Sequence, residues 1–400
     1  MKTRVFHGDV SGAAEIIAAG GLVAVPTETV YGLAGDGLNV EAVERIYEVK
    51  GRPEVKPLSL MVPGPEAMER YCEDVPPQSK LLAEKFWPGP LTIILKSKPV
   101  VPEIVRAGGE TVGLRCPDHA DTLALLRRCG VPLAAPSANP SGAPSPKTAG
   151  DVLGYFDGQI EGVIDGGECG IGRESTIIDL AHRPFRVLRQ GALPEEEIAD
   201  ALAGGLKVIG LTGGSGAGKT TALEVLRGMG ALCIDCDKVY HELTRTSAEL
   251  REALTARFGD VYTPDGALDR KALGRIVFAD AHALADLNAI THSAVGAEVK
   301  RRLREWAMQG GTLAAIDAVA LFEGGADALC TATFAVTAPS GERIRRIMER
   351  EGISEEYAKL RIGAQAPDSY YSGRCTEVLV NDKSKEDFAK LCESEFRKVI

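Results

Sequence analysis

The chain has 400 residues, 44% of them hydrophobic and 26% charged, and its formal net charge is −10. This composition is typical of a soluble globular protein, and the length predicts two or three domains because single cores stop growing at about 250 to 300 residues. The first 205 residues carry 20 basic and 28 acidic side chains, and the remaining residues carry 26 and 28. Neither part is a basic domain that would hold nucleic acid by its net charge, so we expect no strong direct nucleic-acid binding.

No apolar run in the sequence is long enough to cross a bilayer, and the opening MKTRVFHGDV lacks the apolar core of a signal peptide. We therefore expect a cytoplasmic protein without a membrane partner. The nine cysteines are scattered and show no framework spacing, which favours reduced thiols over disulfides.

The first part of the chain mixes short strand patterns with helical ones. Val40, Val43 and Ile46 recur at helical spacing in VEAVERIYEVK and predict a helix over 40–50. This mixture predicts an α/β domain. The predicted strands are 21–27, 91–97, 111–117, 131–137, 175–180 and 185–191.

A domain boundary is expected near Gly205. The helical pattern PEEEIADALAGG ends on two glycines, and the apolar strand LKVIGL begins directly after them. Glycines commonly follow the end of a helix. The sequence therefore predicts two domains, residues 1–205 and 206–400.

The second part alternates strands with amphipathic helices. The predicted strands are KVIGLTG, ALCID, TLAAID, TATFAVTA and EVLVN. Such alternation favours a parallel sheet with helices on both faces.

A glycine-rich loop, GLTGGSGAGKTT, joins the first of these strands to a helical pattern. It fits the P-loop spacing, in which backbone N–H groups surround phosphate oxygens, Lys219 reaches the β- and γ-phosphates and Thr220 offers its hydroxyl to Mg²⁺. We therefore expect this part to bind a nucleoside triphosphate with its Mg²⁺. The expected binding residues are Gly213, Gly214, Ser215, Gly216, Ala217, Gly218, Lys219, Thr220 and Thr221.

The segment ALCIDCDKVYHEL follows the first crossover helix, and its carboxylates Asp235 and Asp237 are expected to face the P-loop. A carboxylate there can accept the proton of an acceptor hydroxyl or hold a Mg²⁺-bound water, and the alternative for either aspartate is a helix N-cap. Cys233 and Cys236 have Cys-x-x-Cys spacing, but only His241 lies near them. We interpret both as packing residues at a strand end rather than as a zinc or redox site.

Several motifs of residues 206–400 together resemble dephospho-CoA kinase: the P-loop, IDCDKVYHEL, LDRKALGRIVF, LNAITH, IDAVALFE, RIRRIMEREG, RIGAQ and VLVN. The resemblance implies a P-loop kinase that uses ATP and Mg²⁺ to phosphorylate the 3′-hydroxyl of dephospho-CoA, giving coenzyme A.

The resemblance also implies roles for individual residues. It makes Asp235 the base, adds Lys219 to the catalytic set, and places Arg346 and Arg350 on a mobile lid over the triphosphate, where guanidinium groups can spread over phosphoryl charge. The alternative for both arginines is a solvated basic helix face. The departures from the family pattern bear on acceptor fit and are Cys236, Ser293, Val319 and Ala320.

Three polar segments stand out in the first part: PTETVYGLAGDG, KGRPEVKPLSL and PSANPSG. The third gives Ser137 and Asn139 as donors on a rigid turn. In the second, Lys50, Arg52 and Lys56 form a cation cluster at a predicted helix end. The cluster is either an anion site or a C-cap that interacts with the helix dipole.

Together with FWPGPLTIIL, TVGLRCP, GRESTIIDL and RVLRQGA, these segments resemble the YrdC-type threonylcarbamoyl-adenylate synthase over nearly all of residues 10–200. The resemblance implies a twisted-sheet α/β domain that condenses L-threonine, bicarbonate and ATP to threonylcarbamoyl-AMP and pyrophosphate. This nucleotidyltransferase step belongs to the tRNA processing that makes N6-threonylcarbamoyladenosine, and it requires a separate threonylcarbamoyl transferase. A carbamate oxygen must attack the α-phosphate, so cations have to neutralise two anions.

The same resemblance assigns the synthase residues. Lys50 and Arg52 are catalytic, and Thr29, Arg115 and Ser175 hold the threonine, with Arg115 on its carboxylate. The residues that face ATP are Lys50, Arg52, Lys56, Thr111, Ser137, Asn139, Ser145 and Arg189.

Alternatives remain for individual synthase residues. Thr111 and Ser175 are also compatible with ordinary strand hydrogen bonds, and Ser145 with a helix N-cap followed by Pro146. Met61 stands where longer relatives carry a histidine.

At the level of function, the alternative is an RNA-binding module fused to a nucleoside or nucleotide kinase. The acidic charge and the 5% aromatic content argue against an RNA-binding surface.

Overall fold

The computed structural model describes residues 2–400, and the chain separates into two compact units. The first unit extends to Gly205 and includes Met308–Gly310, and the second comprises Leu206–Ala307 and Gly311–Ile400. None of the helices within residues 2–400 combines the length and apolarity needed to span a bilayer.

The first unit is an α/β fold on a mixed sheet of ten strands in the order β1-β8-β2-β3-β7-β4-β6-β5-β9-β10. All six predicted strands are present, and four strands of three to five residues were not predicted because they are too short to show a period. The strands are β1 (Arg4–Phe6), β2 (Val23–Val25), β3 (Gly32–Asp36), β4 (Ser59–Met61), β5 (Leu91–Lys96), β6 (Thr111–Arg115), β7 (Leu133–Ala134), β8 (Gly162–Ile164), β9 (Thr176–Asp179) and β10 (Arg186–Arg189).

Helices flank this sheet, and the predicted helix over 40–50 is one of them. It begins after Asn39, whose side chain accepts a hydrogen bond from the N–H of Ala42, and ends at Gly51, which has the left-handed φ of 55°. Its apolar face, including the fully buried Ile46, packs into the core, so the cation cluster follows a fixed helix end. The helices are α1 (Ser11–Ala18), α2 (Val40–Lys50), α3 (Ala67–Tyr71), α4 (Pro77–Phe86), α5 (Glu103–Arg106), α6 (Ala120–Cys129), α7 (Ala149–Phe156) and α8 (Glu195–Gly204).

The second unit is built on an all-parallel sheet of five strands in the order β12-β13-β11-β14-β15, which confirms the predicted parallel sheet. Each predicted strand is present. The strands are β11 (Lys207–Thr212), β12 (Leu232–Asp235), β13 (Leu313–Asp317), β14 (Ala332–Thr337) and β15 (Glu377–Val380).

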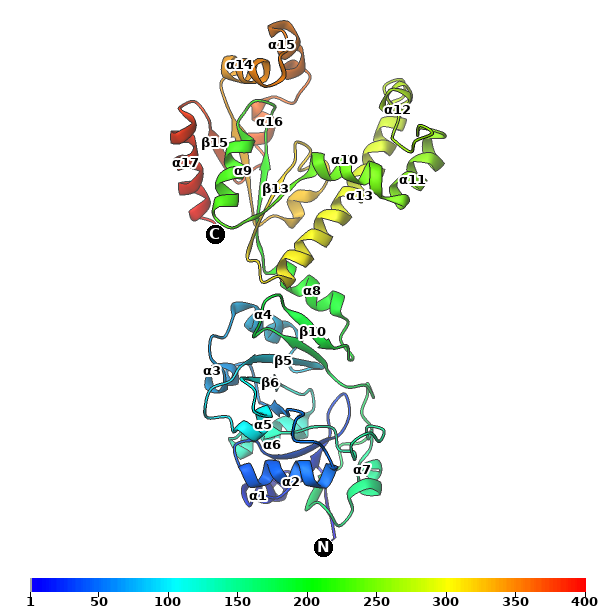
Figure 1. The fold of residues 1–400 in the computed structure, drawn as a ribbon, viewed down its shortest axis with the longest axis vertical. Helices are drawn as coiled ribbons and strands as arrows, with labels where there is room; N and C mark the ends of the chain where they lie inside the picture. Colours follow the sequence, from blue (N-terminus) through cyan, green and yellow to red (C-terminus); the bar gives the residue numbers. More distant parts are fainter. Residues whose placement is uncertain (1) are drawn as a thin grey trace. The chain divides into compact units, whose positions relative to one another are not determined.

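Both faces of this sheet are covered. Helices α9 (Lys219–Gly228) and α17 (Lys385–Arg397) pack together over one face (Figure 1), where Phe334 and Phe396 meet edge to face with ring centroids 5.0 Å apart. On the other face, a Cβ added at Gly210 of β11 would lie 2.8 Å from Cys330 Sγ. The segment between β13 and β14, which contains Cys330, therefore packs against β11. The continuous burial of β11 from Val208 to Thr212 reflects these two layers.

Two helical parts project from the sheet of the second unit (Figure 1). One contains α11, α12 and part of α13 and has its own apolar core around Leu254 and Leu273. The other contains α14 and α15, which pack on each other. The remaining helices are α10 (Cys236–Thr246), α11 (Ala248–Phe258), α12 (Arg270–Val277), α13 (Ala281–Met308), a 3₁₀ turn (Ala326–Leu329), α14 (Ser340–Glu351), α15 (Glu355–Gly363) and α16 (Asp368–Ser372).

Candidate active sites

The first candidate site lies at the carboxyl ends of three neighbouring strands in the second unit. Because β13 lies between β12 and β11, the last residues of these strands meet the P-loop at one sheet edge, where parallel sheets place ligands. The cavity there has a volume of about 450 Å³. Its lining residues are Gly214, Ser215, Gly216, Gly218, Lys219, Thr220, Asp235, Asp237, Lys238, His241, Asp317, Val319, Arg346, Arg350 and Arg361.

The P-loop has the conformation that its glycines predict. Gly213 and Gly218 have φ of 133° and 112°, and a Cβ at Gly213 would lie 2.2 Å from the carbonyl oxygen of Val336. The Lys219 ammonium donates to the carbonyl of Gly213 at 2.9 Å, which holds it over the loop. Of the predicted P-loop residues, Gly213, Ala217 and Thr221 do not line the cavity.

Side chains from outside the loop hold its backbone. Arg343 is 5% exposed; its Nε donates to the carbonyl of Ser215 at 3.0 Å, and its Nη1 and Nη2 donate to Asp368 and Gln365 at 3.0 Å each. Gln365 accepts from the N–H of Ser215 at 2.9 Å and donates to its hydroxyl at 2.7 Å. These bonds hold the loop to α14 and to the connection between α15 and α16. The RIRRIMEREG and RIGAQ motifs contain Arg343 and Gln365, but the sequence alone did not single them out.

Arg346 also bonds the backbone of the P-loop. Its Nη1 lies 3.3 Å from the carbonyl oxygen of Gly216 and 3.4 Å from that of Ala217, and its Nη2 donates to Asn381 at 3.3 Å. Arg350 bonds Glu351, and its side chain lines the cavity. Both predicted lid arginines therefore line the P-loop cavity, and Arg361, which no sequence motif had indicated as a site residue, lines it with them.

Asp235 ends β12 and also begins the next helix. It is the N-cap of α10, where its Oδ1 accepts from the N–H of Lys238 at 3.1 Å, and its Oδ2 lies 3.1 Å from the Lys238 ammonium. Its carboxylate also lines the P-loop cavity, so the capping alternative and the functional one apply to the same side chain. Asp237 lies in the first helical turn, so its predicted alternative as an N-cap is wrong.

A third carboxylate, Asp317, lies beside Asp235. The two residues are register partners at the ends of β13 and β12. Burial raises the pKa of Asp317 to about 6. The positive charge of Lys219 lowers this pKa, and the negative charge of Asp235 raises it. The motif IDAVALFE contains this residue, but only the strand order places it against the P-loop.

The raised pKa of Asp317 makes the stability of the second unit depend on pH. Between about pH 4 and 6 the unfolded chain has released this proton and the folded chain retains it, so the free energy of unfolding falls as pH rises and stays lower above pH 6. An Asp317→Asn variant escapes this loss, which amounts to at most about 3 kcal/mol. Denaturant unfolding at pH 4.5 and 7.5 checks this: the stability gain over wild type must be larger at pH 7.5. An equal gain at both pH values, or the same gain in the exposed-site variant Asp260→Asn, contradicts the assignment.

The two cysteines of ALCIDCD lie on different elements. Cys233 lies on β12, and its thiol contacts the carbonyls of Leu223 and Ala231 at 3.5 and 3.7 Å. Cys236 begins α10, so the expectation that it continues a strand end is wrong; burial raises the pKa of its thiol to about 12, which makes it a poor nucleophile. Within residues 2–400 no group of three or more potential ligands of the His, Cys, Asp and Glu types comes together for a metal.

A second cavity, of about 230 Å³, adjoins the P-loop cavity: Asp237 and Val319 line both. Its walls combine apolar side chains, among them Leu287, with the polar groups of Asn288 and His292. The departures Cys236, Val319 and Ala320 line this cavity. These positions therefore shape the space beside the P-loop rather than the loop itself.

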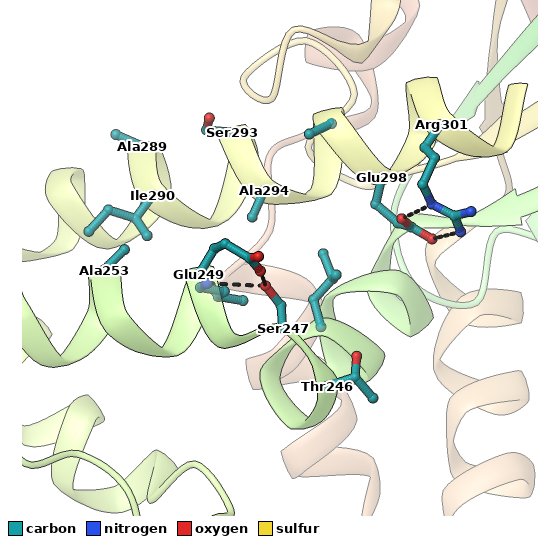
Figure 2. Close-up of a pocket in the computed structure, with 13 residues that line it drawn as sticks. Thr246, Ser247, Glu249, Ala253, Ala289, Ile290, Ser293, Ala294, Glu298 and Arg301 are labelled. Carbon is teal, nitrogen blue, oxygen red and sulfur yellow. Dashed lines mark hydrogen bonds and ion pairs between the residues drawn. The ribbon is translucent and has the colours of Figure 1, made fainter. Parts of the chain in front are cut away.

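A larger cavity of about 900 Å³ lies between α11 and α13 (Figure 2). Figure 2 shows small side chains such as Ala294 along its α13 wall and the ion pair between Glu298 and Arg301 near one end, with Nε and Oε2 at 2.7 Å. Ile290 and Ala294 face this cavity, whereas Asn288 and His292 face the one beside the P-loop, so the two lie on opposite faces of α13. None of the predicted site residues lines it.

The second candidate site is a cavity of about 150 Å³ in the first unit, at the ends of β4 and β6 and the start of β9. Three arginines and one glutamate supply its charged groups. Its lining residues are Val30, Tyr31, Gly32, Arg52, Pro57, Leu58, Ser59, Met61, Thr92, Arg115, Ala135, Pro136, Ser137, Glu174, Ser175, Ile177 and Arg189.

Arg115 is buried at the end of β6 and has partners already. Its Nη2 donates to Glu28 Oε1 at 2.6 Å and to the Thr29 hydroxyl at 2.7 Å, and its Nε lies 3.4 Å from the carbonyl oxygen of Gly89. Thr29 is fully buried. Two of the three predicted threonine-binding residues therefore touch each other, and Glu28 joins them.

Ser175 links the other side of the cavity. Its hydroxyl lies 2.8 Å from that of Thr92 and accepts from Arg189 Nη2 at 3.1 Å, and its carbonyl accepts from Arg189 Nη2 at 2.8 Å. Burial lowers the pKa of Arg189; the negative charge of Glu174 opposes this shift, and the positive charges of Arg115 and Arg52 add to it. The cavity is therefore electropositive and suited to an anion.

Lys50 acts on the turn that carries Ser137 and Asn139. It is 3% exposed, and its ammonium donates to the carbonyls of both residues. Burial, with a contribution from the Arg52 charge, lowers its pKa to about 8. Asn139 Oδ1 is buried and has no hydrogen-bond partner within residues 2–400.

Six predicted residues do not line the cavity: Thr29, Lys50, Lys56, Thr111, Asn139 and Ser145. Thr111 begins β6, four residues before Arg115, and a strand of that length separates them by about 13 Å. Lys56 accepts at its carbonyl from Arg52 and Tyr47 and does not line the cavity either. Ser145 donates to Glu174 at 2.7 Å. Its predicted alternative as an N-cap is wrong, because Thr148 caps α7 through a capping box with Asp151.

Comparison with known proteins adds relatives for both units. The Sua5/YciO/YrdC family model, described as telomere recombination, matches residues 15–191. A threonylcarbamoyl-AMP synthase of Pyrococcus abyssi is 46% identical over 198 residues, which is 50% of this chain and 58% of the relative. One from Bacillus subtilis is 44% identical over 220 residues, 52% of this chain and 63% of the relative. The chain thus spans about three fifths of the length of these relatives.

The dephospho-CoA kinase family model matches residues 207–387. A dephospho-CoA kinase of Geobacter sulfurreducens is 35% identical over 189 residues, which is 47% of this chain and 96% of the relative. Among solved structures, a crystal structure of P. abyssi Sua5 complexed with L-threonine aligns with 80% of this chain and 93% of its own at 28% identity, with a TM-score of 0.49.

Proposed function

We propose that this chain is a bifunctional enzyme. The premise is that it belongs to the dephospho-CoA kinase family through residues 207–387 and carries a Sua5/YrdC-type domain in residues 15–191. The second unit phosphorylates the 3′-hydroxyl of dephospho-CoA with ATP. The first unit makes threonylcarbamoyl-AMP and pyrophosphate from L-threonine, bicarbonate and ATP.

The observation that carries the kinase proposal is the carboxylate of Asp235 on the wall of the P-loop cavity, across the sheet edge from Lys219. In this proposal Asp235 accepts the proton of the acceptor hydroxyl as the γ-phosphoryl group moves to it. Lys219, Arg346 and Arg350 balance the charge of the triphosphate. The cavity that shares Asp237 with the P-loop site receives dephospho-CoA, since its polar and apolar walls match a ligand with both characters.

The observation that carries the synthase proposal is the pair of guanidinium groups, Arg52 and Arg189, that face the cavity of the first unit while they donate to main-chain carbonyls. Such groups suit the meeting of a carbamate with the α-phosphate of ATP. We place threonine near Thr29, Arg115 and Ser175. Lys50 contributes by holding the turn that presents Ser137 and Asn139 to the nucleotide.

The P-loop cavity also fits the magnesium ion that accompanies ATP. Thr220 offers a hydroxyl there, and the carboxylates of Asp235 and Asp317 lie on the same wall. Oxygen donors of this kind suit Mg²⁺, which proteins commonly bind through a few side chains together with substrate phosphates. When bound, the ion screens charge on the β- and γ-phosphates.

Arg343 is expected to control ATP binding through the shape of the P-loop. An Arg343→Leu variant loses three charge-assisted hydrogen bonds to Ser215, Gln365 and Asp368, so we expect the KM for ATP to rise about tenfold with little change in the KM for dephospho-CoA. Steady-state kinetics with each substrate varied measures both. The matched control is Arg345→Leu on the same helix, because Arg345 is exposed and bonds only Glu342 and Glu349. Equal effects of the two variants refute the role of Arg343.

Each activity has a direct substrate test. The second unit must transfer phosphate to dephospho-CoA and not to nucleosides; phosphorylation of nucleosides instead makes it a different kinase. The first unit must release pyrophosphate only when threonine and bicarbonate are both present. ATP consumption without threonine rejects the synthase proposal and leaves the RNA-binding alternative, which a binding assay with tRNA then examines.

The proposal implies partners outside this chain. Threonylcarbamoyl-AMP needs a separate transferase that passes the threonylcarbamoyl group to adenosine in tRNA. We also propose a cytoplasmic location, supported by nine cysteines that are all free thiols.

A further inference from the structure

Four neighbouring strands of the first unit place one residue each in a row across the sheet, and this row forms part of the cavity wall. Met61 of β4 pairs with Arg115 of β6, and Thr92 of β5 pairs with Ile177 of β9. The antiparallel register of β5 against β6 sets Thr92 beside Arg115. All four residues line the cavity. Adjacent strands lie about 4.8 Å apart, so one small molecule can touch several members of the row.

The side chain of Thr92 is fixed within this row. Its methyl group lies against β6, where a Cβ added at Gly113 would be 3.1 Å from Thr92 Cγ2. Its hydroxyl lies 2.8 Å from the hydroxyl of Ser175, which also accepts from Arg189 Nη2 at 3.1 Å. Thr92 and Ser175 are both buried, and both line the cavity. The two hydroxyls therefore form a pair of defined direction, which we call the hydroxyl pair.

The hydroxyl pair has one hydrogen to spare. Its two hydroxyls carry two hydrogens, and the bond between them uses one. The bond from Arg189 brings its own hydrogen and takes a lone pair of Ser175. Within residues 2–400 the two hydroxyls make no other hydrogen bond. An oxygen of a molecule in the cavity can accept the second hydrogen, and buried polar groups are stable when they are paired in this way.

We propose that the hydroxyl pair receives the side-chain hydroxyl of L-threonine, which makes Thr92 a specificity-determining residue of the first unit. This inference rests on the proposed synthase function. The order of the row matches the order of groups in the amino acid: Arg115 takes the carboxylate, Thr92 faces the hydroxyl on the β-carbon, and Ile177 packs against the methyl group. A site that hydrogen-bonds a substrate hydroxyl rejects an analogue without it, because its own polar groups are then left unpaired.

The test compares L-threonine with L-2-aminobutyrate, which lacks only the hydroxyl. The full chain is assayed for pyrophosphate release with ATP and bicarbonate; kcat/KM is measured for threonine, and L-2-aminobutyrate is titrated as a competitive inhibitor. In wild type its inhibition constant should exceed the KM for threonine at least tenfold. Thr92→Val keeps the shape of the side chain and removes its hydroxyl. We expect it to lower kcat/KM for threonine about tenfold and to leave the inhibition constant within about twofold.

Two further variants separate recognition from packing. Thr92→Ser retains a hydroxyl at this position and should keep kcat/KM for threonine within about threefold of wild type. Thr3→Val is the matched control. Thr3 is also buried, and its hydroxyl donates to the carbonyl of Ile160 at 2.8 Å, but it does not line the cavity. Its loss should not change the preference for threonine over L-2-aminobutyrate.

The possible failures are distinct. Equal weakening of both ligands by Thr92→Val shows a structural role and overturns the proposal. Wild-type protein that binds L-2-aminobutyrate as tightly as threonine overturns it too, whether or not Thr92→Val folds. A rise in the KM for bicarbonate alone assigns the hydroxyl pair to the carbamate and also contradicts it. If wild type shows no threonine-dependent pyrophosphate release, the synthase function itself falls, and this inference falls with it.

Discussion

Replacing Asp235 by Asn is expected to lower kinase turnover about 100-fold or more while ATP binding stays within about twofold of wild type, because the variant loses a general base and keeps the P-loop. Asparagine caps helices as well as aspartate does, so the hydrogen bond to the N–H of Lys238 and the start of α10 are retained. Single-turnover phosphorylation of dephospho-CoA, combined with calorimetric titration of ATP, measures the two effects separately.

Asp237→Asn is the matched control for this variant. Asp237 lies in the first turn of the same helix and lines the same cavity, but the proposed proton transfer does not use it, so its loss should cost less than about tenfold. If Asp237→Asn is the slower enzyme, or if Asp235→Asn turns over at the wild-type rate, the base has been assigned to the wrong carboxylate.

Replacing Arg115 by Met is expected to destabilise the first unit by about 3 to 5 kcal/mol, because it leaves the carboxylate of Glu28 buried without its cation. The two side chains are only 9% and 14% exposed. For a unit of this size, the loss lowers Tm by about 10 °C. The same variant should abolish threonine-dependent pyrophosphate release. Differential scanning calorimetry and the release assay check both effects.

A double variant separates the missing ion pair from general damage. Adding Glu28→Gln to Arg115→Met removes the stranded charge and should restore part of the lost stability but no synthase activity. Arg186→Met, on the exposed strand β10, should be close to wild type. If the double variant is no more stable than Arg115→Met alone, the buried pair is not the cause of the loss.

The sequence was most informative where chemistry is local. The P-loop, the strand before it and the acid at the end of β12 lie in contiguous motifs, and the structure brings Lys219 and Asp235 to one cavity. The helix over 40–50 was also predicted, because its apolar spacing and the glycine after it are local features.

Residues brought together by distant pairing were harder to find. Asp317 reaches the P-loop only because β13 lies between β12 and β11, and no local pattern encodes that order. Arg343 braces Ser215 across 128 positions of sequence. Ser145 suggested an N-cap because Pro146 follows it, but the capping box of Thr148 and Asp151 prevails, since it satisfies two groups reciprocally.

The central claim, two ATP-dependent reactions at separate sites of one chain, is tested most directly by assaying both reactions on the intact protein and on two single variants. We predict that wild type forms both coenzyme A and threonylcarbamoyl-AMP. Asp235→Asn should lose only the first product and Arg52→Ala only the second. Loss of both products in either variant, or the absence of one reaction from the wild-type chain, would contradict the account.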